Sequence, residues 1–130
     1  MTRPFSILLV DDDDPLRRCL AEVLAMRGWD VHHTGLGQEA IEMARALPVD
    51  FSILDLHLRG MTGIDVLRQI AREVRPLPSI MISGQASQEE TAAALSAGAF
   101  SLLRKPFELK DFMATVQLLI QQRFGGQLPH

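Results

Sequence analysis

An apolar run changes abruptly into an acidic run in the stretch Ile7-Leu8-Leu9-Val10-Asp11-Asp12-Asp13-Asp14-Pro15. The apolar part, residues 7–10, has the length and composition of a buried strand. The aspartates follow it directly, which is where an open α/β sheet forms its binding sites. An acidic run is more often a solvated loop than a site, so the interpretation depends on what the rest of the chain supplies.

The composition is that of one folded domain. The chain has 130 residues, 47% of them hydrophobic, which is enough for a core without disulfides. The single cysteine, Cys19, excludes a disulfide framework and is expected to be a small, half-buried hydrophobe. A net charge of −3, with basic pairs only at 17–18 and 104–105, argues against direct nucleic-acid binding by this chain. There is no stretch of membrane-span length and no signal-peptide core, so we expect a cytoplasmic module without membrane contact.

Short apolar runs alternate with helical patterns along the chain. Strands are expected at 7–10, 31–34, 51–54, 79–82 and 100–103, and helices at 15–27, 38–47, 64–74 and 88–97, with a last helix whose apolar face runs from Leu109 to Ile120. Asp14 is the expected N-cap of the first helix and Gly28 its expected C-cap. Strands that are apolar nearly throughout are typical of a parallel sheet covered on both faces. We predict a three-layer α/β domain over residues 1–124, with residues 125–130 as a flexible tail or the start of a linker.

Polar residues recur where the predicted strands end, namely Asp11, Asp12, Asp55, Ser83 and Lys105. Because the C-terminal ends of parallel strands share one edge of the sheet, these side chains are expected to converge. Carboxylates can bind Mg²⁺, and a carboxylate can also attack phosphorus as a nucleophile. A lysine and a hydroxyl would then neutralise and hydrogen-bond the phosphoryl oxygens.

The chain resembles the receiver domain of two-component response regulators, of which the chemotaxis regulators are one kind, over about residues 5–123. The motifs that carry the resemblance appear in order as ILLVDD at 7–12, LDLHL at 54–58, GMTG at 60–63, ISG at 82–84, GA at 98–99 and KPF at 105–107. The resemblance implies a flavodoxin-like (βα)5 fold with a five-stranded parallel sheet in the order 2-1-3-4-5.

The resemblance also implies a function. Asp55 matches the phosphoacceptor, while Ser83 and Lys105 match the groups that contact the phosphoryl group. Such a domain is a signalling switch that catalyses only its own phosphorylation and dephosphorylation. The implied partners are a histidine kinase or phosphotransfer protein and a downstream effector protein or domain. A phosphorylation-linked homodimer would use the face formed by residues 88–97, 100–103 and 109–120.

The implied cofactor is Mg²⁺ or Mn²⁺. The metal ligands matched by the resemblance are Asp11, Asp12, Asp55 and the backbone carbonyl of His57. The His57 side chain is expected to face solvent, and Lys105-Pro106 is a candidate cis peptide. Asp13 and Asp14 are expected to serve capping and solubility, and the pair His32-His33 is given no role.

Two positions depart from the family pattern. Arg59 stands where a proline is common, and Leu102 stands where an aromatic residue usually takes part in switching. Phe100 has the alternation parity of residue 102 and is expected to replace that ring only in part. A pseudo-receiver that acts as a phosphorylation-independent interaction module therefore stays open as an alternative. A third hypothesis, a Mg²⁺-dependent phosphohydrolase, would need a second acid and a cap, and no insertion here is long enough for a cap.

Overall fold

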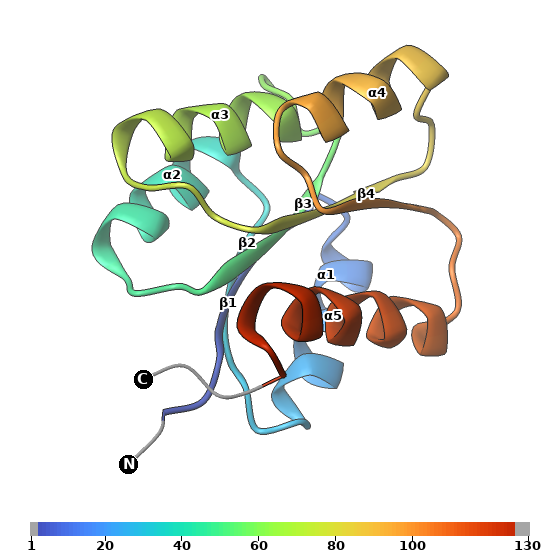
Figure 1. Cartoon of the computed structure of the whole chain (residues 1–130). Coiled ribbons are helices and arrows are strands. Elements are labelled where there is room, and N and C mark those ends of the chain that lie inside the picture. The colour runs from blue at the N-terminus through green and yellow to red at the C-terminus, as the bar shows by residue number, and fades with distance from the viewer. Residues whose placement is uncertain (1–2, 127–130) are drawn as a thin grey trace.

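Strands and helices alternate strictly along residues 3–126, which are the residues that the computed structural model describes (Figure 1). The strands are β1 (Ser6–Val10), β2 (Asp30–Thr34), β3 (Phe51–Asp55), β4 (Ser79–Ser83) and β5 (Ser101–Arg104). The helices are α1 (Asp14–Ala25), α2 (Gly37–Ala46), α3 (Gly63–Glu73), α4 (Gln88–Ser96) and α5 (Leu109–Phe124). Residues 127–130 of the predicted tail lie outside the described residues.

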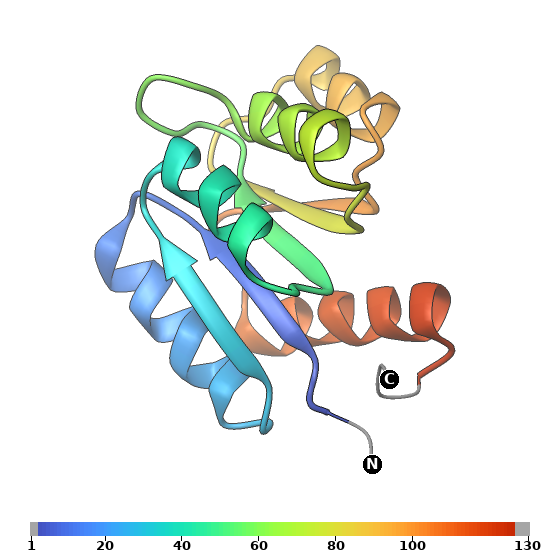
Figure 2. The same ribbon diagram turned by 90° about the vertical axis from the view of Figure 1, so that its left-hand side faces the viewer.

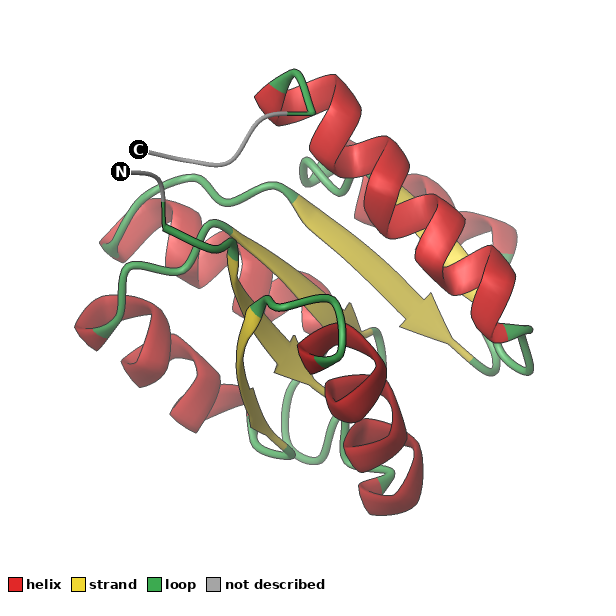
Figure 3. Cartoon of the chain, turned by 90° about the horizontal axis from the view of Figure 1, so that it is seen from below, coloured by secondary structure: helices red, strands yellow, loops and turns green. Residues whose placement is uncertain are grey.

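The five strands form one parallel sheet in the order β2-β1-β3-β4-β5, which confirms the predicted fold class. All strand arrows therefore point the same way (Figure 3). Val10 pairs with Leu54 and Asp55 pairs with Ile82, so the ends of β1, β3 and β4 are level with one another. This register brings the polar residues that follow the strands to one edge of the sheet.

Helices cover both faces of the sheet. Helices α2, α3 and α4 lie on one face, and α1 and α5 lie on the other (Figures 1 and 2). Side chains alternate along each strand: Leu8 and Val10 join the core under α2–α4, while Ile7 and Leu9 join the core under α1 and α5. Because both faces are buried, β1 is apolar from Ile7 to Val10, and each of these side chains contributes about 1.5–3 kcal/mol.

The N-terminus of α1 differs by one residue from the prediction. Asp13, not Asp14, is the N-cap, and its carboxylate accepts a hydrogen bond from the Leu16 amide at 3.2 Å. The amide that Asp14 would need in that role belongs to Arg17, and it already donates to the Asp13 carbonyl at 2.9 Å. The prediction of a C-cap at Gly28 was also wrong, because α1 ends at Ala25 with Met26 as its C-cap.

Two predicted side-chain environments are wrong. Cys19 is exposed, because Leu20 and Leu24 form the buried face of α1. Phe100 precedes β5 and packs in the core under α1 and α5, whereas Leu102 packs in the core under α2–α4. The alternation begins only at Ser101, so the parity inferred for Phe100 does not apply. None of the helices within residues 3–126 has the length and apolar character needed to cross a bilayer.

Candidate functional site

The C-terminal edge of the sheet carries the five polar residues singled out in the sequence. Asp11 and Asp12 follow β1, Asp55 is the last residue of β3, Ser83 is the last residue of β4, and Lys105 follows β5. The peptide bond between Lys105 and Pro106 is cis, as predicted. The Lys105 amide donates to the Ser83 carbonyl at 2.7 Å, which ties the end of β5 to the end of β4.

The three predicted metal-ligating aspartates form a compact cluster. Asp11, Asp12 and Asp55 each offer a carboxylate oxygen, and these oxygens lie within 4.8 Å of one another. Asp11 is fully buried, Asp55 is 5% exposed and Asp12 is half-buried. The Lys105 Nζ lies 2.9 Å from Asp11 Oδ2 and 3.4 Å from Asp55 Oδ2. The cluster therefore carries more negative charge than the lysine can balance.

One oxygen of the cluster lacks the hydrogen bond that burial normally demands. Asp11 Oδ1 accepts a bond from the Asp13 amide at 2.9 Å. Asp11 Oδ2 is fully buried and has no hydrogen bond of acceptable geometry within the described part of the chain, although Lys105 Nζ is near it. Buried carboxylate oxygens are nearly always satisfied, and a divalent cation with oxygen ligands would satisfy this one. The aspartate cluster is thus a group of residues that could hold a metal ion.

The electrostatics of the cluster alter two proton affinities. Burial and the neighbouring Asp11 carboxylate raise the pKa of Asp55 to about 6, against the opposing effect of Lys105. For Lys105, burial lowers the pKa, but the Asp11 carboxylate 2.9 Å from its Nζ, together with the charge of Asp55, outweighs burial and raises the pKa overall. At neutral pH Asp55 is mainly ionised and Lys105 is protonated.

A hollow of about 440 Å³ opens beside Asp55. It is lined by Asp55, His57, Gly84, Gln85, Glu90 and Lys105. Ser83 is buried at the end of β4, where its Oγ accepts a hydrogen bond from the Gln85 amide at 3.2 Å. That contact leaves the hydroxyl proton free to be donated to an anion. The hollow therefore combines a carboxylate, an ammonium group and a nearby hydroxyl.

The loop after β3 is held close to Asp55 by Gly63. A Cβ atom at position 63 would lie 2.4 Å from the Asp55 carbonyl oxygen, so only glycine fits there. The Gly63 amide donates to the Leu56 carbonyl at 2.8 Å, and the His57 amide donates to Asp55 Oδ1 at 3.3 Å. These contacts fix the backbone beside the carboxylate cluster.

The His57 side chain is exposed, as predicted, but it has a partner. Its Nε2 lies 2.7 Å from Oε2 of Glu90, which is in the first turn of α4. The other oxygen of Glu90 accepts a hydrogen bond from the Ser87 amide at 3.1 Å and completes the capping box of α4. Glu90 therefore joins the start of α4 to the loop after Asp55, a contact that nothing in the sequence spacing indicates.

Two arginines flank the acidic loop, of which the sequence interpretation singled out Arg59 and not Arg17. Arg17 contacts Asp14 and His33, and Arg59 helps to line a second hollow beside Asp12. Both arginines come from elements next to the cluster in space. Arg17 could have been suspected from its spacing of three residues from Asp14, whereas the contact with His33 depends on how β2 lies against α1.

Comparison with known proteins identifies the family. A family model described as the response regulator receiver domain matches residues 7–117. The chain belongs to the response regulator receiver domain family. Receiver domains are signalling switches of two-component systems and not enzymes in the usual sense.

Curated relatives of this receiver domain are longer than the chain. It is 30% identical to the probable transcriptional regulatory protein TcrX of Mycobacterium tuberculosis, over 92% of the chain and 51% of the relative. It is 31% identical to the regulatory protein AtoC of Escherichia coli, over 93% of the chain and 26% of the relative. The chain therefore spans about half of the first relative and about a quarter of the second.

Solved receiver domains have the same architecture. The non-phosphorylated HemR receiver domain from Leptospira biflexa is 30% identical and superposes with a TM-score of 0.85, over 97% of this chain and 98% of that one. A CheY-like receiver domain from Methanospirillum hungatei reaches a TM-score of 0.88 at 22% identity, over 95% and 99% of the two chains, and supports the fold alone.

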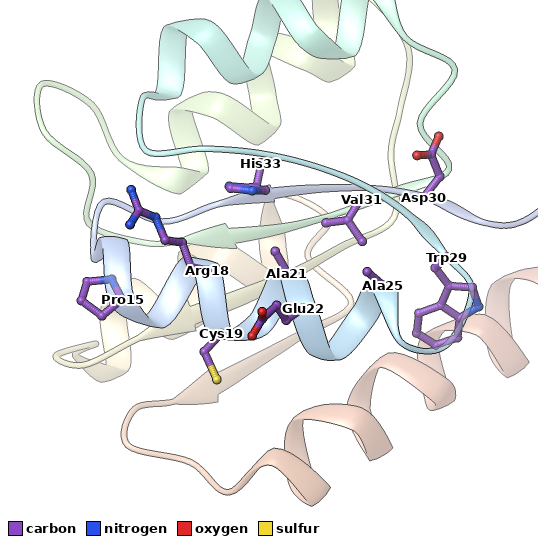
Figure 4. Close-up of a pocket in the computed structure, with 10 residues that line it drawn as sticks. All are labelled: Pro15, Arg18, Cys19, Ala21, Glu22, Ala25, Trp29, Asp30, Val31 and His33. Atoms are coloured by element: carbon purple, nitrogen blue, oxygen red, sulfur yellow. The ribbon is translucent and has the colours of Figure 1, made fainter.

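A separate groove runs along the outer side of α1 and β2. Figure 4 shows Arg18 and Cys19 on α1, with His33 on β2 and Trp29 at the far end of the groove. Its lining includes none of the three clustered aspartates and no residue from the end of β4 or β5. The groove is therefore distinct from the carboxylate site of the receiver domain.

Proposed function

We propose that this receiver domain accepts a phosphoryl group on Asp55 from a histidine kinase or phosphotransfer protein, in a Mg²⁺-dependent reaction. The observation that carries the proposal is the cluster of three carboxylates within 4.8 Å, two of them buried, with Lys105 at its edge. Repulsion between buried carboxylates destabilises the fold when no cation is bound, and such clusters are typical of functional sites.

Asp11, Asp12, Asp55 and the backbone carbonyl of His57 would hold Mg²⁺ or Mn²⁺. The donor set consists of hard oxygen atoms, and the buried Asp11 Oδ2 forms an ion pair with Lys105 Nζ at 2.9 Å but no hydrogen bond among the described residues, so the site fits such an ion. When bound, the ion would neutralise charge on the transferring phosphoryl oxygens.

The chain's own residues supply the rest of the chemistry. A carboxylate oxygen of Asp55 attacks phosphorus, and the new P–O bond forms as the P–N bond to the donor imidazole breaks. The electron pair stays on the departing nitrogen, and the imidazole leaves in its neutral form because its other ring nitrogen carries a proton. A raised pKa makes the Asp55 carboxylate a better nucleophile while leaving it mostly ionised at neutral pH. Lys105 and the Ser83 hydroxyl would hold the phosphoryl oxygens in place.

The output of phosphorylation would be a changed interaction surface. The added charge at Asp55 would reorder the loops after β4 and β5 and alter the α4-β5-α5 face, which a downstream effector or a second copy of the domain would recognise. We assign residues 1–124 to the domain and residues 125–130 to a tail or linker. The curated relatives extend well beyond the matched region, which leaves room for an attached output domain in a longer protein.

Chemical phosphorylation tests the proposal directly. The chain, incubated with acetyl phosphate and Mg²⁺, should gain the mass of one phosphoryl group. Borohydride trapping, which reduces an aspartyl phosphate to homoserine, should locate that group at Asp55. EDTA should prevent labelling if the metal is required.

Two variants complete the test. Asp55→Asn should lose the label while remaining folded, because the change is nearly isosteric. Asp65→Asn serves as the matched control, since Asp65 lies on α3 near the site but is exposed, and this variant should label normally. Persistent labelling of Asp55→Asn would move the acceptor elsewhere. An unlabelled wild-type chain would favour the pseudo-receiver alternative.

A further inference from the structure

The guanidinium group of Arg17 is clamped between the acidic loop and strand β2. Its side chain is only 11% exposed. Nη1 donates to the Asp11 backbone carbonyl at 2.8 Å and lies 2.6 Å from the Asp14 carboxylate, while Nε donates to His33 Nδ1 at 3.1 Å. The clamp therefore holds the loop that carries Asp11 and Asp12 at both of its ends and ties it to the neighbouring strand.

Gly35 leaves the space that this clamp occupies. A Cβ atom at position 35 would lie 2.9 Å from Arg17 Nη1 and 3.5 Å from the Asp11 carbonyl oxygen. The backbone of Gly35 does not adopt a left-handed conformation, so the space around it and not its φ angle demands glycine. Alanine would fit only if the end of the Arg17 side chain moved away.

Charge and geometry predict opposite effects of Arg17 on cation binding. A guanidinium beside the carboxylate cluster repels a divalent cation, so charge alone implies that removing Arg17 tightens metal binding. A clamp on the Asp11 carbonyl orients the Asp11 and Asp12 carboxylates, so loss of the clamp implies weaker binding. The direction in which metal affinity changes when Arg17 is removed therefore distinguishes the charge effect from the positioning effect.

We infer that Arg17 is a positioning residue for the metal site, holding the Asp11–Asp14 loop through the Asp11 carbonyl, the Asp14 carboxylate and His33. This inference rests on the proposed function, in that it requires the aspartate cluster to bind a divalent cation. Arg17 does not touch the metal ligands' carboxylates in any described contact, and it acts through the backbone of Asp11.

Mn²⁺ binding to the unphosphorylated chain tests the inference. Free Mn²⁺, followed by electron paramagnetic resonance during titration, reports the affinity without any phosphotransfer. Arg17→Met should weaken Mn²⁺ binding by roughly tenfold, the usual effect of removing a group that orients a metal ligand. Arg17→Lys, which keeps the charge but cannot make both sets of contacts, should give an intermediate loss.

Arg18→Met is the matched control. Arg18 is the next residue of α1, carries the same charge and is exposed on the outer groove (Figure 4), and its side chain makes no hydrogen bond or ion pair within the described residues. Its loss should leave Mn²⁺ affinity unchanged or slightly higher. Gly35→Ala keeps every charge and displaces only the end of Arg17, so it should weaken binding nearly as much as Arg17→Met.

The outcomes separate the inference from the proposed function. A wild-type chain that does not bind Mn²⁺ would overturn the proposed metal site and the inference with it. A wild-type chain that binds, together with Arg17→Met and Gly35→Ala variants that bind equally well or better, would overturn the positioning role alone. Should Arg17→Met fail to fold by circular dichroism, Gly35→Ala decides the question, because its only close contact is with a movable side-chain end.

Discussion

Asp55 lies where the fold disfavours its ionised form. Burial and the adjacent Asp11 carboxylate raise its pKa from 3.8 to about 6, although Lys105 opposes the change. The folded chain consequently holds a proton on Asp55 at pH values where the unfolded chain has lost it. The free energy of unfolding must therefore fall as the pH rises through this interval, by up to about 3 kcal/mol above about pH 7.

Asp55→Asn should remove this pH-dependent cost. In EDTA we expect the variant to have nearly the same free energy of unfolding as the wild type near pH 4. The variant should become more stable than the wild type as the pH rises from about 4 to about 6, and the difference should level off at no more than about 3 kcal/mol above about pH 7. Urea unfolding followed by circular dichroism across this pH range measures the difference. Adding Mg²⁺ to the wild type should narrow the difference in the free energy of unfolding, because a bound cation offsets the repulsion between the clustered carboxylates.

Asp65→Asn provides a control with the opposite sign. Hydrogen bonds from the Thr62 backbone and side chain lower the pKa of Asp65, so its ionised form is favoured in the fold. Its contribution to stability is present above its ordinary pKa and is lost as the pH falls below it. This variant should not gain stability at neutral pH.

A constant difference between Asp55→Asn and the wild type at every pH would show that the Asp55 charge does not oppose folding.

At the scale of elements, helix α4 is connected to the site by side chains at its start. Glu90 contacts His57 at 2.7 Å, and Arg104 on β5 donates to the Ala86 carbonyl at 2.8 Å and to Thr91 Oγ1 at 3.4 Å. Leu102, on the same strand, packs with an aliphatic side chain against the core under α2–α4, as do Ala93 and Ala97 of the α4 region. These contacts join the loop after Asp55 and the end of β5 to the start of α4.

Phosphorylation should move the loop between β4 and α4 more than strand β5. Leu102 has no ring to exchange between an inward and an outward position. Glu90, in contrast, lines the hollow beside Asp55 and contacts His57 there. We expect the amide hydrogen exchange rates of the apo and beryllofluoride-bound states to differ mainly in residues 83–90. Changes confined to residues 100–104, with residues 83–90 silent, would contradict this mechanism. Leu102→Tyr should enlarge the response on β5 if the missing ring limits it.

At the scale of the whole molecule, the α4-β5-α5 face is the surface that we propose for partners. Leu95 on α4 and Leu109 at the start of α5 are 48% and 43% exposed. Met26, the C-cap of α1, is 84% exposed, and α1 packs beside β2 at the opposite edge of the sheet from β5. Leu95 and Leu109 therefore represent the proposed homodimer face, and Met26 serves as an exposed apolar residue outside it.

We expect Leu95→Glu to weaken self-association of the activated domain. Sedimentation of the beryllofluoride-bound chain over a range of concentrations should show dimers for the wild type and for Met26→Glu, and mainly monomers for Leu95→Glu, because a buried unpartnered carboxylate opposes the interface. Equal association of both variants would place the interface elsewhere. An activated wild type that remains monomeric would remove the homodimer from the proposal.

The sequence by itself was enough to predict the alternation of elements and the meeting of Asp11, Asp12, Asp55 and Lys105 at one edge. Apolar periodicity is local, and parallel strands necessarily end on the same side, so the strand ends indicate the site without knowledge of packing. The cis peptide before Pro106 followed from the family motif. Boundaries shifted by one or two residues, as at Asp13, because competing hydrogen bonds choose the cap.

Only the tertiary structure decided which distant side chains touch and what their environment does to them. The contacts of Arg17 with His33 and of His57 with Glu90 join residues 16 and 33 positions apart, and no periodic pattern encodes such pairs. The exposure of Cys19 and the placement of Phe100 beneath α5 depend on helix orientation and on where β5 begins. The raised pKa of Asp55 has the same origin, because burial and a neighbouring charge exist only once the chain has folded.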